Sequence, residues 1–418
     1  MSFARTTIVG AGLAGLSAAV RSVEAGLKVQ IVDSAAQAGG RCRSYHDPQL
    51  GLTIDNGNHL VLAGNRSVAS FRAGVGATEP MAGPAHADFA FADLQSGERW
   101  TIRINDGRLP WWVFAKNRRV PNTSASDYLK FASLLTGARS GTISGRIDCR
   151  NPAWKRLMEP VLLAMLNTPP ESASLRLASA VLRESLLRGG KASLPRIASP
   201  SLAAAFIDPA VRWLAKRSVS VSLGKRLHAL DPEGDRVTAL DWGAGPQAVA
   251  SDEAVILAVP PWAASSLLPG ISAPDEFHAI VNGHFAMSPP ASAPSMLGLL
   301  GGTAEWLFAF NDRISVTVSA ADDLVNVERE ELARRFWKDI RDAYGLRAEM
   351  PRWQIVKEKR ATFAATPEQD LKRPASRTRW SNLFLAGDWI QTGLPATIEG
   401  ALRSGETAAQ LVSGRRAR

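Results

Sequence analysis

The chain has 418 residues, of which 45% are apolar and 21% charged, and this composition excludes a disordered, collagen-like or coiled-coil protein. It contains only two cysteines, Cys42 and Cys149, so a disulfide framework and a cysteine-rich metal site are also excluded. The formal net charge is +10, from 49 basic and 39 acidic residues.

The positive charge is concentrated in residues 101–226, where 21 basic and 7 acidic residues give a net charge of +14, against −4 for the remainder. Such a region favours contact with phosphate in nucleic acid, anionic lipid or a diphosphate substrate, and a solvated basic surface is the alternative interpretation. No apolar stretch reaches the roughly 18 residues of a membrane-spanning helix, so the sequence leaves peripheral membrane contact open.

The first forty residues predict a strand, a glycine-rich turn, a helix and a second strand. Residues 6–9 are rich in β-branched side chains, and residues 10–15 have the spacing Gly-x-Gly-x-x-Gly. Apolar residues then recur at helical spacing up to residue 26, and residues 28–32 form the second strand, which ends at Asp33. This order is typical of a Rossmann-type dinucleotide site.

Each residue of the turn has an expected role in binding a dinucleotide. Gly10 permits the tight turn, Gly12 lets the backbone approach a pyrophosphate, and Gly15 lets the helix lie close to the strand. The N–H groups at the start of the helix, at Leu13 and Ala14, are expected to point toward the phosphates. A glycine-rich helix start without a ligand is the alternative.

Asp33 and the residues after it favour FAD over other dinucleotides. Asp33 stands 18 residues after Gly15, where a carboxylate accepts both ribose hydroxyls and disfavours the 2′-phosphate of NADP. Gly39 and Gly40 allow a second close pass of the backbone, and Arg41 can pair with the pyrophosphate or lie beside the flavin. This arrangement resembles the GG-R motif of the FAD-dependent amine oxidase and phytoene desaturase superfamily, with an ordinary surface turn as the alternative.

Two apolar segments of the middle region each have two interpretations. Residues 110–114 are mostly aromatic and precede Lys116, Arg118 and Arg119, which suits either a membrane interface or an anchor under a surface loop. Residues 153–167 carry an apolar stripe at helical spacing, which is either plain core or one wall of a lipid tunnel.

Two strands are predicted in the centre of the chain. Residues 218–223 alternate in polarity and lead to Leu227, and residues 254–262 are a nearly continuous apolar run that ends in Val-Pro-Pro-Trp. Both resemble the superfamily's return to the FAD domain, in which the backbone at Leu227 would hold the adenine. Each segment also reads as an ordinary core strand.

The C-terminal part predicts a second strand–loop–helix unit. Residues 380–389 predict a buried strand that ends in Gly387 and Asp388, and residues 393–401 begin a helix with Pro395 in its first turn. Asp388 can accept a hydrogen bond from a ribityl hydroxyl, and the helix start can stabilise negative charge on a flavin. The residues at that start are Ala396, Thr397 and Ile398. The block resembles the superfamily's second FAD motif, and a helix cap without a ligand is the alternative.

Together these elements predict an α/β fold of the amine oxidase type. Residues 1–70, 215–265 and 375–415 would form a discontinuous Rossmann-type FAD-binding domain. Residues 71–214 would form a mainly helical region that contacts substrate and membrane. Residues 266–374 would form a mixed α/β substrate domain, with strands at 307–310 and 314–318 and a helix at 328–343.

Several segments together resemble the squalene-associated FAD-dependent desaturase family, whose members include hydroxysqualene dehydroxylases of hopanoid biosynthesis. They are residues 55–60, 118–121, 166–174, 386–389 and 393–401. The resemblance runs from Thr6 to about Val412, and residues 166–174 are its most family-specific part. The family usually has Gln at the position of Asn58, and many superfamily members have Glu at the position of Asp33.

The resemblance implies an FAD-dependent oxidoreductase that acts on a C30 isoprenoid. Protonation of hydroxysqualene and loss of water would give an allylic cation, and hydride from N5 of reduced FAD would then give squalene. His59 is the first candidate for the proton donor, or else a group that hydrogen-bonds the backbone or the cofactor. Glu171 is the second candidate, or else the start of the next helix, while Asp55 is expected to hold structure. The other histidines show no metal-ligand spacing, so no metal is expected.

The resemblance also implies a cytoplasmic enzyme, peripheral on the inner face of the plasma membrane and able to associate with squalene-pathway enzymes. A carotenoid or phytoene-type desaturase, a flavin amine oxidase, and an isoprenoid carrier with structural FAD are the alternatives. No nucleic-acid partner is expected, because the basic region lacks a binding motif.

Overall fold

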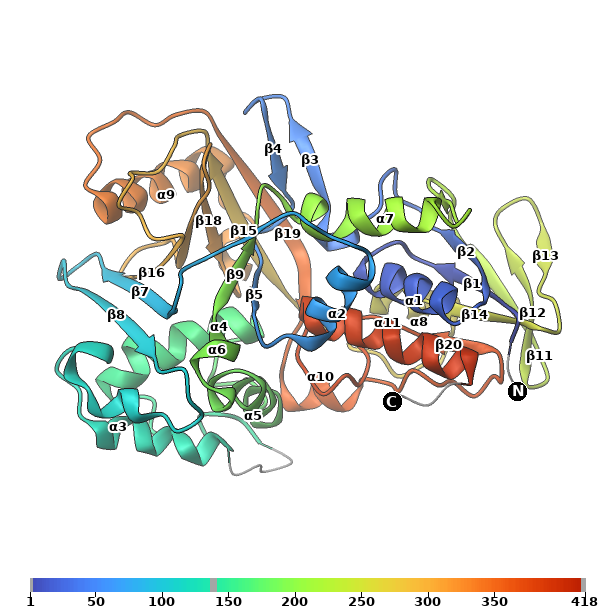
Figure 1. Cartoon of the computed structure of the whole chain (residues 1–418), viewed down its shortest axis with the longest axis horizontal. Coiled ribbons are helices and arrows are strands. Elements are labelled where there is room, and N and C mark those ends of the chain that lie inside the picture. The colour runs from blue at the N-terminus through green and yellow to red at the C-terminus, as the bar shows by residue number, and fades with distance from the viewer. Residues whose placement is uncertain (1–2, 136–140, 415–418) are drawn as a thin grey trace.

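The computed structural model describes residues 3–135 and 141–414. Figure 1 shows two lobes side by side. The first lobe carries the long helices α1 (Leu13–Glu24) and α11 (Ile398–Ser413), and the second combines a large mixed sheet with a group of short helices. The predicted α/β class is confirmed.

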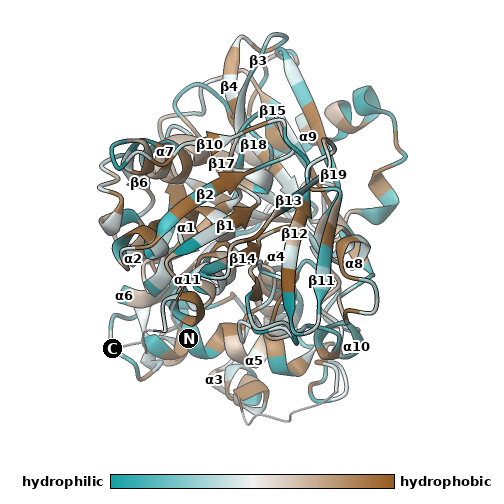
Figure 2. Cartoon of the chain, turned by 90° about the vertical axis from the view of Figure 1, so that its right-hand side faces the viewer, coloured by the Kyte–Doolittle hydropathy of each residue, from teal (hydrophilic) through white to brown (hydrophobic). Residues whose placement is uncertain are grey.

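The first lobe is built on a five-stranded parallel sheet with the order β10-β2-β1-β14-β20. Its strands are β1 (Arg5–Val9), β2 (Lys28–Val32), β10 (Val221–Ser222), β14 (Glu253–Leu257) and β20 (Leu383–Leu385). Parallel strands are apolar because both faces of the sheet are covered, and Figure 2 shows hydrophobic strands inside the molecule. Three distant segments of the chain therefore meet in one sheet.

The two faces of this sheet are covered by different elements. Helices α1 and α11 pack together over one face, and a Cβ on Gly405 of α11 would lie only 2.2 Å from the Ala14 carbonyl oxygen. Over the other face lies an antiparallel sheet of β11 (Ala229–Glu233), β12 (Arg236–Asp241) and β13 (Pro246–Ala248). Its Leu230 and Val237 share a buried cluster with Val255 of β14.

The second lobe contains a seven-stranded mixed sheet with the order β19-β15-β18-β17-β16-β7-β8. Its strands are β7 (Ala87–Asp93), β8 (Arg99–Ile104), β15 (Phe277–Phe285), β16 (Met296–Leu300), β17 (Trp306–Ala309), β18 (Ile314–Val318) and β19 (Trp353–Phe363). Helix α9 (Arg329–Tyr344) packs on one face, and the other face adjoins the main apolar cluster of the molecule.

Short helices and small sheets complete the structure. The helices are α2 (Arg66–Gly74), α3 (Ala125–Leu129), α4 (Glu159–Leu166), α5 (Leu175–Glu184), α6 (Gly190–Ser193), α7 (Asp208–Ala215), α8 (Pro261–Leu267) and α10 (Pro367–Leu371). β3 (Ser44–Asp47) pairs with β4 (Leu52–Asp55), and β9 (Pro195–Ala198) lies between β5 (Leu60–Leu62) and β6 (Met81–Ala82). A π-helical turn at Trp154–Met158 precedes α4, so the helix predicted at 153–167 is present but irregular.

Residues 71–214 contain more helix than strand, but they also contain strands that the prediction did not include. Residues 87–104 form the β7–β8 hairpin, which extends the mixed sheet through parallel pairing of β7 with β16. In β8, Trp100, Ile102 and Ile104 are buried while the residues between them are exposed, which is strand periodicity. This region therefore contributes two strands to the sheet that was predicted for residues 266–374 alone.

Three smaller expectations also change. Helix α11 begins at Ile398 with Thr397 as its N-cap, so Pro395 precedes the helix instead of lying in its first turn. The strand expected at 380–389 is confined to Leu383–Leu385. The strand expected at 254–262 ends at Leu257, because Pro261 opens helix α8.

Candidate active site

The glycine-rich turn between β1 and α1 leaves an opening at one of its three glycines. A Cβ on Gly10, whose φ is +111°, would lie 2.3 Å from the Ala258 carbonyl oxygen, and a Cβ on Gly15 would lie 1.8 Å from that of Gly10. Apart from its two chain neighbours, no described residue has an atom within 4 Å of the Cβ position of Gly12. Gly10 and Gly15 are thus required by the protein's own packing, whereas Gly12 leaves room for a ligand.

This opening lies at the N-terminus of α1, where Gly12 is the N-cap and Leu13 and Ala14 are the first two helical residues. The first N–H groups of a helix have no acceptor within the helix, and they carry the positive end of its dipole. A pyrophosphate is therefore the ligand that suits both the space and the charge.

Asp33 is held beside the same turn at the end of β2. One carboxylate oxygen accepts the Ala11 N–H at 2.6 Å and the other accepts the Ala35 N–H at 2.7 Å. Each oxygen keeps further acceptor capacity, which is what two ribose hydroxyls require. The Lys225 N–H donates to the Asp33 carbonyl at 3.0 Å, so the segment leading to Leu227 runs beside this ribose position.

Arg41 joins both FAD motifs to the large sheet. It follows Gly39 and Gly40, which both have positive φ, and the Gly39 N–H donates to the Ala11 carbonyl at 2.9 Å. One guanidinium nitrogen of Arg41 donates to Asp388 at 2.6 Å and another to the carbonyl of Ala361 in β19 at 2.7 Å. This ion pair brings together residues that are 347 positions apart.

The second FAD motif forms a sharp turn between β20 and α11. Gly387 has a φ of +148°, and its N–H donates to Ser404 Oγ at 2.8 Å. Asp388 is buried, and the Thr397 side chain caps α11 by accepting the Gly400 N–H at 3.0 Å. The residues from Ala396 to Ile398 thus place a second helix N-terminus after Asp388.

Arg373 holds this turn, and the sequence analysis missed it. Its buried guanidinium donates to the carbonyl oxygens of Asp388, Trp389 and Ile390, and it pairs with Asp370 at 3.1 Å. Arginine followed by proline is common at surfaces, so the sequence has no local pattern that marks this residue as buried.

His59 lies among the charged groups of the site, whereas Glu171 does not. Burial and, to a smaller extent, the Arg41 cation lower the pKa of His59 to about 4, and Asp388 opposes this shift. The imidazole is therefore neutral at pH 7, which argues against its acting as a cationic proton donor. Glu171 is exposed and its charge acts on Cys149 and Lys155, so the structure does not bring the two candidates together.

Asp55 has the structural role that was expected of it. It is buried, and it accepts hydrogen bonds from Ser44 Oγ at 2.5 Å and from the Leu202 N–H at 2.9 Å. Burial raises the pKa of its carboxyl group, and these two hydrogen bonds oppose that rise. Asp55 thus connects β3 and β4 to the segment before α7.

Residues 166–174, the most family-specific part of the resemblance, connect the group of short helices to the mixed sheet. Asn167, with φ +47°, ends α4 and donates to Thr362 Oγ1 of β19 at 2.9 Å while accepting the Ala320 N–H at 2.7 Å. Thr168 Oγ1 accepts the Ala365 N–H at 2.8 Å. No pattern in the sequence indicates these contacts for either side chain.

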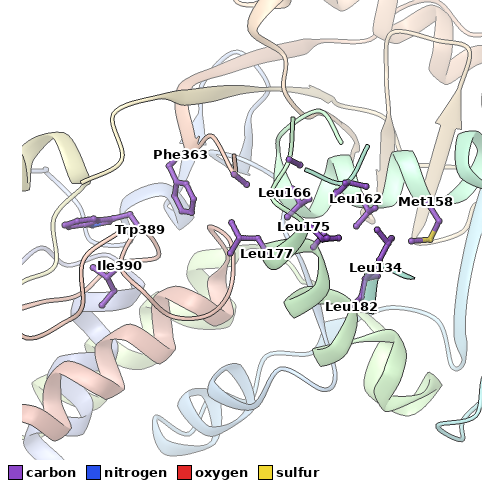
Figure 3. Close-up of a cluster of buried hydrophobic side chains, with 14 of the residues drawn as sticks. Leu134, Met158, Leu162, Leu166, Leu175, Leu177, Leu182, Phe363, Trp389 and Ile390 are labelled. Carbon is purple, nitrogen blue, oxygen red and sulfur yellow. The ribbon is translucent and has the colours of Figure 1, made fainter. Parts of the chain in front are cut away.

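A continuous apolar cluster leads from this site into the helical group (Figure 3). It starts at Trp389 and Ile390, beside Asp388, and passes Phe363 at the end of β19. From there it continues through side chains of α4, α5 and the turn before α4, namely Leu177, Leu175, Leu166, Leu162 and Met158. The site therefore adjoins an extended apolar region rather than a polar cleft.

Comparison with known proteins agrees with this geometry. Residues 13–413 match the model of the flavin containing amine oxidoreductase family. The chain belongs to this family. Its cofactor is FAD, and the open space at Gly12, the acceptors of Asp33 and the two helix N-termini fit that group.

Within the family, the chain is similar over nearly its whole length to proteins named hydroxysqualene dehydroxylase. That of Zymomonas mobilis is 48% identical over 97% of this chain and 98% of that protein. That of Rhodopseudomonas palustris is 50% identical over 97% of each chain. The predicted resemblance is thus confirmed, whereas a 15-cis-phytoene desaturase of Glycine max matches only 28% of this chain.

Comparison with solved structures supports the fold. An oxidoreductase from Methanosarcina mazei superposes with a TM-score of 0.74 at 15% identity, covering 97% of this chain and 100% of that one. Within residues 3–135 and 141–414, no cluster of three metal-ligating side chains is present. In the same residues, no helix has the length and apolar character needed to cross a bilayer.

Proposed function

We propose that this flavoenzyme reduces hydroxysqualene to squalene. The observation that carries the proposal is the identity of 48% and 50% to two hydroxysqualene dehydroxylases over 97% of the chain. The apolar cluster beside Asp388 supports it, because a C30 isoprenoid needs a long apolar surface at the flavin. The match to phytoene desaturases is too short to favour a desaturase.

The reaction replaces a hydroxyl group by hydrogen. The allylic alcohol gains a proton and loses water, and the resulting carbon cation takes up a hydride, so that the alcohol and the two-electron reductant give squalene and water. Reduced FAD supplies that hydride when it is bound. The protein must bind the chain, orient the carbon that carries the hydroxyl group, and keep bulk water away.

The residues of the site divide these tasks. We propose that the backbone at Gly12, Asp33 and the start of α11 hold the cofactor, and that Arg41 fixes Asp388 beside it. We propose His59 as a neutral hydrogen-bonding group of the site, because its pKa is about 4. The Leu227 backbone is proposed to hold the adenine, because it follows Lys225 by two residues and the Lys225 N–H donates to the Asp33 carbonyl.

We propose that the domain division follows the sheets. Residues 1–70, 215–265 and 375–415 would form the FAD-binding domain, since they supply all five strands of the parallel sheet. Residues 266–374 together with the β7–β8 hairpin would form the substrate domain. The remainder of residues 71–214 would wall the apolar cluster.

We also propose that the turn at Trp111–Phe114 rests on the cytoplasmic face of the plasma membrane. Leu109 is 81% exposed, Trp111 49% and Phe114 65%, and the guanidinium of Arg118 lies 4.6 Å over the Trp111 ring. Exposed apolar side chains beside cations suit an anionic lipid surface. A water-insoluble substrate would be exchanged there with the other enzymes of squalene formation.

Vesicle binding tests this surface. The double variant Trp111→Ser/Phe114→Ser is expected to bind phosphatidylglycerol vesicles about tenfold or more weakly, since two exposed apolar groups are lost. Leu371→Ser is the matched control, because Leu371 is 84% exposed on α10, outside the basic region. Equal binding by the wild-type protein and the double variant, or an equal loss in the control, would contradict the assignment.

Anaerobic turnover tests the reaction. The holoenzyme is photoreduced, hydroxysqualene is added in detergent, and the flavin spectrum is followed while the lipid is extracted. We expect return of the oxidised flavin band together with one equivalent of squalene. Bleaching of the oxidised enzyme by phytoene would instead identify a desaturase and bleaching by an amine an amine oxidase, while no redox change with any of these compounds would identify a carrier.

A further inference from the structure

Three polar side chains form a small network on the face of the mixed sheet that adjoins the main apolar cluster. Asn282 of β15 and Thr317 of β18 stand directly opposite each other, and Asn58 approaches both. Thr317 Oγ1 donates to Asn282 Oδ1 at 2.8 Å, and Asn58 Nδ2 donates to Thr317 Oγ1 at 3.0 Å and to the Val316 carbonyl at 3.2 Å. The network fixes the orientation of both amides.

Two atoms of this network have no partner within the described part of the chain. They are the acceptor Asn58 Oδ1 and the donor Asn282 Nδ2, and the two residues are 9% and 1% exposed. Rotating the Asn282 amide would take away the acceptor of Thr317, and rotating that of Asn58 would turn its oxygen toward the Val316 carbonyl. Buried amide groups are costly when they stay unpaired, so these two atoms require a hydrogen-bonding partner from outside the described chain.

The position of the network connects it with the flavin site. Asn58 immediately precedes His59, whose pKa responds to the charges of Arg41 and Asp388. Trp306 stands opposite Thr317 on the neighbouring strand and belongs to the apolar cluster that also contains Trp389. The unpaired donor and the unpaired acceptor thus form a polar position beside the apolar cluster that would contact an isoprenoid.

We infer that Asn58 and Asn282 bind the hydroxyl group of the substrate. A hydroxyl both accepts and donates, so Asn282 Nδ2 donates to its oxygen and Asn58 Oδ1 accepts its hydrogen. The pair positions the carbon that carries the hydroxyl group. It also makes the site bind the alcohol more tightly than squalene, because squalene would leave both amides unpaired. This inference rests on the proposed function.

Ligand binding to the oxidised holoenzyme tests the inference without turnover. Dissociation constants for hydroxysqualene and squalene are measured in the same detergent from the change in the flavin spectrum. Asn282→Leu is expected to weaken hydroxysqualene binding about tenfold and to leave squalene binding unchanged, as for the loss of one buried hydrogen bond. Ser315→Ala is the matched control, because Ser315 lies two residues before Thr317 and its hydroxyl is already paired with His284 at 2.8 Å.

The outcomes separate this inference from the proposal on which it rests. If Asn282→Leu weakens both ligands equally, or weakens neither, the two amides hold only water and the inference is wrong. If that variant loses FAD, Asn282→Ala removes the same donor without adding a branched apolar group and decides the question. If the wild-type protein fails in the anaerobic turnover experiment, the proposed function fails first, whatever the variants bind.

Discussion

Gly15→Ala is expected to prevent folding, whereas Gly12→Ala is expected to fold normally and to lose FAD. A Cβ at Gly15 would lie 1.8 Å from the Gly10 carbonyl oxygen, so helix α1 would have to move off the sheet. A Cβ at Gly12 meets no described atom within 4 Å apart from those of its chain neighbours, but it enters the space proposed for the pyrophosphate. We expect Gly15→Ala to cost on the order of 4 kcal/mol or more, as for severe overpacking.

The measurement compares the apoproteins by urea denaturation and then titrates each with FAD. The free energy of unfolding of Gly12→Ala should lie within about 0.5 kcal/mol of the wild-type value, because the added methyl group contacts no neighbouring element. Its affinity for FAD should be on the order of 100-fold weaker. Normal FAD affinity in Gly12→Ala would place the pyrophosphate elsewhere. A stable Gly15→Ala protein would show that α1 can shift away from β1.

Arg373→Met is expected to destabilise the holoenzyme by about 3–5 kcal/mol, the cost of breaking a buried ion pair. Methionine keeps most of the length of the side chain but leaves three carbonyl groups of the turn at Asp388 without their donor, and Asp370 without one of its two arginines. Since this turn carries Asp388, we expect FAD to be lost together with stability.

Arg377→Met is the control for this prediction. Arg377 is exposed four residues further along the same segment and lies 5.8 Å from the ring of Phe384, so its replacement should change stability by about 0.5 kcal/mol or less. Stability is read from urea midpoints and FAD content from the absorbance of the purified protein. If the two variants lose the same amount of stability and of FAD, the buried network of Arg373 does not hold the turn.

The parts of the site that could be predicted from the sequence are those in which local spacing determines geometry. The turn at Gly10–Gly15, Asp33 at the end of the next strand and the Gly387-Asp388 pair each depend on a single strand–turn–helix unit. Composition and motif order were sufficient for the α/β class as well. The apolar run at 153–167 also predicted a helix, although not its π-helical start.

The remaining features depend on contacts between distant segments. The β7–β8 hairpin could not be predicted because its partner β16 lies about 200 residues further along the chain. The alternation of apolar and polar residues in such short segments is also too weak a signal to assign them as strands. Asn167 and Arg373 act by hydrogen bonds to backbone groups of other elements, and no pattern in the neighbouring sequence reveals these contacts. The low pKa of His59 likewise arises from tertiary burial and from Arg41.

The strand order of the parallel sheet has a consequence for protein synthesis. Strand β1, the first to leave the ribosome, lies between β2 and β14, and the edge strand β20 and helix α11 come last. The nascent chain therefore carries an exposed apolar strand while more than 200 residues are still to be translated. A chain that terminates early lacks Asp388 and the second helix N-terminus, so cofactor uptake would mark only those molecules whose translation has passed α11.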